Sequence, residues 1–215
     1  KARKIVTLPP PLRGAGLTQA LAHMIIDHTP SVHWNYFLAL EADLGLLARW
    51  IEPTERNFDT YSIELARLLM AASAECDVIL KNLCTRIVPG TRVSKLNGYH
   101  PIITGEFRAF TNARVWIPRF GLELRPWSSW SEHQAPFWWT ANNKVKHQRH
   151  DEFQQANLKN TFNSIAALYV AVSHLEAQQT HGLSHAPTYL EADGFAHRDG
   201  NAIIFYQALK IGTVR

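Results

Sequence analysis

The chain has 215 residues, of which 46% are hydrophobic and 19% are charged. This balance is typical of a folded globular domain and excludes an intrinsically disordered chain. The 22 basic and 18 acidic side chains give a formal charge of +4, which permits contact with nucleic acid without requiring it. Eleven glycines and eleven prolines are too few for a collagen-like or low-complexity sequence.

The cysteines and the apolar runs bear on the compartment. Cys76 and Cys84 are eight positions apart in a helical pattern, which places their Cα atoms about 12 Å apart, too far for a disulfide. The longest apolar run, residues 165–172, is about a third of a bilayer span, and no signal-peptide pattern opens the chain. We therefore expect a cytoplasmic protein with reduced thiols and no membrane contact.

The sequence predicts three regions. Residues 1–16 form a basic, proline-rich arm, residues 17–180 a helical domain, and residues 181–215 a C-terminal extension. In the helical domain, residues 17–28 suit a short helix. A second helix is expected to begin after Ser31, a suitable N-cap, because apolar residues recur at helical spacing from Trp34 to Trp50, before Pro53.

A third, longer helix is predicted from Phe58 or Tyr61 to Ile87, since a wide apolar face runs through it and Pro89-Gly90 ends it. A short helix over 102–110 follows. Alternating apolar and polar residues then predict a β-hairpin over about 112–126, with Gly121 near its turn and Pro118 confining its strand to a sheet edge.

Two further helices complete the predicted fold. One begins near Pro136 and carries Trp138-Trp139 into a polar segment, and the other covers about 151–179. The two are either continuous or separated by a bend. The fold class is therefore mainly α: a bundle of four to five helices with a small inserted β-hairpin. Five of the seven tryptophans lie between 116 and 139, where they either pack the hairpin on the bundle, which we favour, or form an interface.

The densest polar cluster spans residues 142–150. Helical geometry places its side chains on two neighbouring faces, one with Asn143, His147 and His150, the other with Asn142, Lys146 and Arg149. An imidazole flanked by cations suits phosphodiester cleavage in RNA, which supplies its own 2′-OH nucleophile and so requires no metal. The alternative is a solvated basic helix end that interacts with the helix dipole.

A wider pattern resembles the HEPN superfamily, a helical group of RNA-cleaving toxins, defence effectors and non-catalytic relatives. The resemblance covers roughly residues 31–178. It rests on three motifs: Tyr61-Ser62-x-Glu64, Glu75-x-Asp77-x-x-x-Lys81, and Trp138-Trp139-x-x-Asn142-Asn143-x-x-Lys146-His147-x-Arg149.

The catalytic signature of that family is Arg, a polar residue, three arbitrary residues and His. Asn143 matches the polar position and His147 the histidine, whereas Asn142 stands where the family has arginine. The resemblance implies His147 as acid or base, with Asn143 orienting it or the phosphate. Asn142, Lys146, Arg149 and His150 would contact substrate. Either activity is lost, or Lys146 or Arg149 supplies the missing cation.

Glu75 and Lys81 are candidate supporting residues. Glu75 lies mid-helix among apolar neighbours, and a buried glutamate needs a cation. A structural ion pair is the interpretation we favour. The alternatives are a pairing with Lys146 or Arg149 that orients them, and a contact that tunes His147. Lys81 lies about 240° around the helix from Glu75, so these two do not pair.

In many family members two copies form one composite cleft, so the resemblance implies a homodimer or pairing with another HEPN-type chain. RNA or a nucleotide would be the ligand. We expect no cofactor and no metal, because the His23–His28 and His181–His185 pairs lack further ligands at zinc-like spacing. The predicted function is metal-independent RNA cleavage in a defence or toxin system. The alternatives are a non-catalytic RNA-, nucleotide- or protein-binding subunit and a structural assembly subunit.

Overall fold

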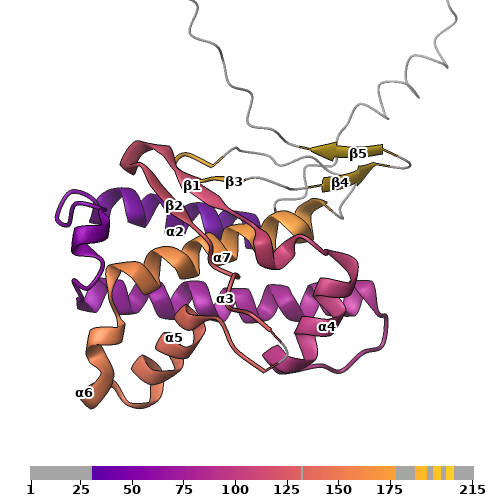
Figure 1. Ribbon diagram of the computed structural model, residues 1–215, viewed down its shortest axis with the longest axis horizontal. Helices are drawn as coiled ribbons and strands as arrows, with labels where there is room; N and C mark the ends of the chain where they lie inside the picture. The colour runs from indigo at the N-terminus through magenta and orange to yellow at the C-terminus, as the bar shows by residue number, and fades with distance from the viewer. Residues whose placement is uncertain (1–30, 132, 178–186, 193–195, 200–201, 206–215) are drawn as a thin grey trace, which may run out of the picture.

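The computed structural model describes residues 31–131, 133–177, 187–192, 196–199 and 202–205 (Figure 1). The predicted arm, the helix over 17–28 and the histidine pairs His23–His28 and His181–His185 lie outside these residues.

Helices make up most of the described chain, and the mainly helical fold class is confirmed. The six α-helices are α2 (Val32–Leu47), α3 (Ile63–Ile87), α4 (Leu96–Glu106), α5 (Phe137–His147), α6 (Arg149–Glu152) and α7 (Leu158–Ala177). Almost every residue of α7 is buried, because α3, α2 and α5 all pack against it. In Figure 1, α4 lies near the C-terminal end of α3, while α5 and α6 lie toward its N-terminal end. Helix α7 is therefore the centre of the core.

Helix α2 begins as predicted. The side chain of Ser31 accepts a hydrogen bond from the backbone N–H of Trp34 at 3.1 Å, which caps the helix. The helix ends at Leu47, and the side chain of Trp50 is 83% exposed. Trp50 therefore does not extend the buried apolar face.

Helix α3 ends at Ile87, as Pro89-Gly90 predicts, and Gly90 has a positive φ of 84°. Its start was predicted a few residues too early. Ser62 is the N-cap and accepts a hydrogen bond from the N–H of Leu65 at 3.2 Å, so the helix proper begins at Ile63.

The predicted hairpin is confirmed, with β1 (Val115–Ile117) paired antiparallel to β2 (Leu122–Leu124). Gly121 adopts a left-handed conformation at φ 64°, which suits glycine in the connecting turn. The prediction that Pro118 confines its strand to a sheet edge was wrong, because β1 is the central strand of the order β2-β1-β3. Pro118 follows β1 in a 3₁₀ turn, so its missing N–H does not interrupt the ladder.

The third strand comes from far along the chain. Strand β3 (Glu191–Ala192) pairs antiparallel with β1, so this part of the predicted C-terminal extension packs on the helical domain. Strands β4 (Ala196–Asp199) and β5 (Ala202–Phe205) form a separate two-stranded sheet.

The last two predicted helices are separated rather than continuous. The chain between them forms α6 and a 3₁₀ turn at Phe153–Gln155. Backbone hydrogen bonds tie the start of α7 to the segment before α3: the N–H of Leu158 donates to Thr60 at 2.9 Å and that of Lys159 to Phe58 at 3.1 Å. The Asn157 side chain accepts from the N–H of Asn160 at 3.0 Å and caps the new helix. This pairing explains why α7 begins only at Leu158.

Candidate functional site

The polar cluster lies on helix α5 and the turn that follows it. Trp138, Ala141 and Val145 form the buried face of α5. The indole N–H of Trp138 donates to the carbonyl of Pro126 at 2.8 Å, which fixes the helix on the loop after the hairpin. The opposite face of α5 carries the polar residues of the predicted site and is open to solvent.

A break after His147 changes the predicted arrangement. Gln148 has φ −135° and ψ 38°, outside the helical region, and Arg149 begins α6. The prediction that His150 shares a helix face with Asn143 and His147 is therefore wrong, as is the common face for Asn142 and Arg149. Asn143 and His147 still lie one turn apart on α5.

Exposure separates the predicted residues into two groups. Asn142 is half-buried, whereas the others are exposed: Asn143, Lys146, His147, Arg149 and His150. An exposed imidazole and two exposed cations thus lie within four positions on one turn. The same residues also fit the alternative of a solvated basic helix end. Lys144, Lys146 and His147 occupy the last turn of α5, where the helix dipole favours positive charge.

Two nearby acids are already paired. Lys144 forms an ion pair with Glu152 at 3.2 Å, and His150 contacts Asp151 at 2.9 Å. Both side chains of the second pair are more than 70% exposed, so solvent weakens that contact. Among the described residues, neither Lys146 nor His147 has a hydrogen-bond or ion-pair partner. Lys146 and His147 are thus unpaired at the surface of this turn.

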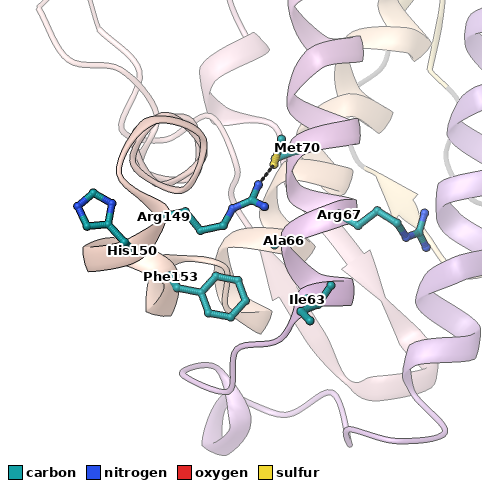
Figure 2. Close-up of a pocket in the computed structure, with 7 residues that line it drawn as sticks. All are labelled: Ile63, Ala66, Arg67, Met70, Arg149, His150 and Phe153. Carbon is teal, nitrogen blue, oxygen red and sulfur yellow. Dashed lines mark hydrogen bonds between the residues drawn. The ribbon is translucent and has the colours of Figure 1, made fainter.

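A pocket of about 730 Å³ adjoins this turn, between the first turns of α3 and α6 (Figure 2). Its apolar lining consists of Ile63, Ala66, Met70 and Phe153, and its polar lining of Arg67, Arg149 and His150. Figure 2 shows the side chain of Arg149 extending toward Met70, where its Nη2 lies 3.1 Å from Sδ. Two predicted site residues, Arg149 and His150, thus belong both to the exposed turn and to the pocket.

The charge of Arg67 is largely offset by acids on the other side of α3. Its guanidinium donates to Asp43 and to Glu64, each at 2.8 Å. The hydrogen bond to Asp43, followed by that to Glu64, raises the pKa of Arg67. Arg149 has no acidic partner among the described residues, so it is the stronger anion-binding group of the pocket.

The structure does not bring Glu75 to the predicted site. Its carboxylate lies 2.5 Å from Nδ1 of His33 on α2, and the amide of Asn82 lies 3.3 Å from Nε2 of the same ring. The alternative pairing of Glu75 with Lys146 or Arg149, and its tuning of His147, are therefore wrong. The partner of the glutamate is His33, which the sequence did not single out because it is 42 positions away.

Lys81 also has a local partner. It forms an ion pair with Asp77, one turn earlier on α3, and not with Glu75. The hydroxyl of Tyr99 donates to the same aspartate at 3.0 Å and thereby links α4 to α3. Burial, with a smaller contribution from Asp77, raises the pKa of Tyr99. Glu75 thus links α3 to α2, whereas Lys81 makes a structural ion pair within α3.

The tryptophan-rich region packs the interior. Trp127, Trp130 and Trp138 are almost fully buried, and the ring centroids of Trp127 and Trp138 are 5.3 Å apart. Trp116 and Trp139 are partly exposed. The prediction that this region packs the hairpin and its loop on the bundle is confirmed for the three buried rings, which are not available to a partner.

Candidate metal sites and membrane-spanning helices are both absent from the part of the chain that the structure describes. There, no group of three or more His, Cys, Asp or Glu side chains is placed to hold a metal ion, and no helix has the length and hydropathy to cross a membrane. Both cysteines are buried free thiols, and burial raises the pKa of Cys84 to about 11.

Comparisons with protein families, with curated proteins and with solved structures found no match.

Proposed function

We propose that this chain is a HEPN-type protein that acts on RNA as a metal-independent endoribonuclease, with the α5–α6 turn as its contact surface. The observation that carries the proposal is the exposed His147 beside Lys146 and Arg149, neither of which is neutralised by an acid among the described residues. Unpaired cations at a surface attract phosphates, and an accessible imidazole moves protons near neutral pH.

The reaction that suits these groups uses the RNA's own 2′-oxygen as nucleophile. The 2′-oxygen loses its proton and bonds to phosphorus, and the bond from phosphorus to the 5′-oxygen breaks as that oxygen gains a proton. The products are a 2′,3′-cyclic phosphate and a 5′-hydroxyl. His147 accepts the first proton or donates the second, while Lys146 and Arg149 stabilise the negative charge that develops on the phosphoryl oxygens.

Two further roles follow from the position of the residues. Asn143, one turn before His147 on the same face of α5, is suited to orient the imidazole or the phosphate. Asn142 is half-buried and uncharged, so it replaces the family's arginine in position but not in charge. A second proton-transfer group is needed, and either His150 or His147 of a second copy supplies it. The proposal includes a homodimer, which would bring the second His147 to the cleft, in the cytoplasm, where both free thiols stay reduced.

A second candidate function is favoured by Asn142. Without an arginine at that position, the same surface serves to bind RNA, a nucleotide or a second HEPN-type chain without turnover. Restoring the cation with Asn142→Arg would then create activity from a binding subunit.

The test is cleavage of end-labelled mixed RNA in EDTA by the wild type, His147→Ala and the control His133→Ala. His133 is exposed on the loop before α5 and has no role in the proposal. We expect cleavage by the wild type and the control, and a rate at least 100-fold lower for His147→Ala. Undiminished cleavage by His147→Ala refutes the assignment of the histidine, and no cleavage by any folded variant favours the binding subunit.

A further inference from the structure

The pocket between α3 and α6 combines an apolar lining with the guanidinium of Arg149, whereas the polar ends of the Arg67 and His150 side chains point away from it (Figure 2). In Figure 2 the Phe153 ring and the Arg149 side chain extend from the α6 side toward α3, where Ala66 faces them. None of the described residues that line the pocket is acidic. Such a site fits a ligand with one flat apolar part and one anionic part.

The apolar side of the pocket includes a partly exposed aromatic ring. Phe153 and Met70 are only half-buried, so both keep surface open to the pocket. The ring of Phe153 is held by an edge-to-face contact with Tyr61, at a centroid distance of 5.6 Å. Ala66 contributes only a methyl group to the wall. The volume of about 730 Å³ lies within the range of small-molecule sites and is ample for one nucleotide.

Arg149 joins the pocket to the proposed RNA contact surface. Arg149 and His150 line the pocket, and they directly follow the turn that carries Lys146 and His147. A phosphate held at Arg149 therefore lies at the boundary between the pocket and the turn. Its attached base can reach the Phe153 side, four positions further along the chain.

We propose that this pocket is a nucleobase subsite, in which the base next to the RNA phosphate on the α5–α6 turn stacks on Phe153 while Arg149 binds the phosphate. This inference rests on the proposed function and names the part of the RNA that the pocket recognises. A purine base offers a large flat face for stacking on Phe153, and a 5′-phosphate supplies the anion for Arg149. Guanosine 5′-monophosphate is therefore the probe.

The test titrates the full chain with guanosine 5′-monophosphate, guanosine and inorganic phosphate at low salt, followed by ligand-observed NMR. Phe153→Leu keeps an apolar side chain but removes the ring, and should weaken nucleotide binding at least about fivefold. Phe153→Tyr should restore it. Arg149→Met should weaken binding of the nucleotide and leave that of guanosine unchanged. Circular dichroism confirms that each variant is folded.

The matched control is Arg92→Met, which removes an exposed arginine between α3 and α4, outside both the pocket lining and the α5–α6 turn. It should leave nucleotide binding unchanged. No binding of the nucleotide by the wild type, or equal binding by the wild type and Phe153→Leu, would overturn the subsite.

The RNA assay separates the two proposals. Nucleotide binding that depends on Phe153, in a protein that does not cleave RNA, supports the subsite and refutes the nuclease. Cleavage that depends on His147, together with equal nucleotide binding by the wild type and Phe153→Leu, supports the nuclease and refutes the subsite.

Discussion

We expect Glu41, a residue of helix α2, to anchor the segment that precedes β3. Its side chain is buried, and its carboxylate accepts three backbone hydrogen bonds. Oε1 accepts from the N–H groups of Tyr189 at 2.7 Å and Leu190 at 3.0 Å, and Oε2 accepts from that of Thr188 at 2.8 Å. The perturbation is Glu41→Gln, which preserves the size of the side chain and removes its charge.

The magnitude follows from these three bonds. A glutamine oxygen still accepts two of them, but its NH₂ group faces the N–H of Thr188, a donor against a donor. A hydrogen bond to a charged group contributes about 1.5–3 kcal/mol. Because Thr188 is exposed, water partly replaces the bond that is lost. We expect the free energy of unfolding to fall by about 2 kcal/mol, which corresponds to a Tm lower by about 4–8 °C for a chain of this size.

The assay combines thermal unfolding with amide hydrogen exchange. Exchange should increase in residues 187–192 and at β1, which pairs with β3 through Val115 and Trp116. The control is Glu191→Gln, which removes an exposed carboxylate from β3 itself. A Glu41→Gln variant with wild-type Tm and wild-type exchange would refute the reasoning.

Two further predictions concern the packing of α2 and α7. Gly45→Ala should destabilise the fold by about 1 kcal/mol even though alanine favours helix, because the new Cβ would lie 2.5 Å from the Tyr189 hydroxyl oxygen. In a Tyr189→Ala background the same change should stabilise, and the same sign in both backgrounds would contradict the clash. Burial lowers the pKa of His174 from 6.5 to about 4, so the unfolded chain takes up the proton first. Stability should therefore hold above pH 6.5 and decline as the pH falls toward 4, by up to about 3 kcal/mol. Urea unfolding should show a shallower decline for His174→Phe, and identical declines would refute it.

Local signals predicted much of the fold. The Ser31 cap, the end of α3 at Ile87 and the turn at Gly121 each depend on residues that are neighbours in sequence. Long-range contacts decided what the sequence did not reveal. The start of α7 is set by pairing with residues 58–60, and β1 is central because a strand some 75 positions later joins it.

In the candidate site, too, the part formed by neighbouring residues was predictable and the part formed by long-range contacts was not. The cluster from Asn142 to His150 was predictable because it is continuous in sequence, whereas the pocket was not, since its second wall comes from α3. The partner of Glu75 was missed for the same reason, because His33 lies on another helix.

The salt dependence of RNA affinity tests most directly whether the α5–α6 turn binds RNA phosphates. The double variant Lys146→Met, Arg149→Met is compared with Arg92→Met, Lys95→Met, which removes one exposed lysine and one exposed arginine between α3 and α4. For single-stranded RNA, the loss of two phosphate contacts should reduce the slope of log K against log salt by about 1.4. The account predicts that reduction, with weaker binding, for the first double variant and no change for the second. Equal slopes and affinities in both variants and the wild type would contradict it.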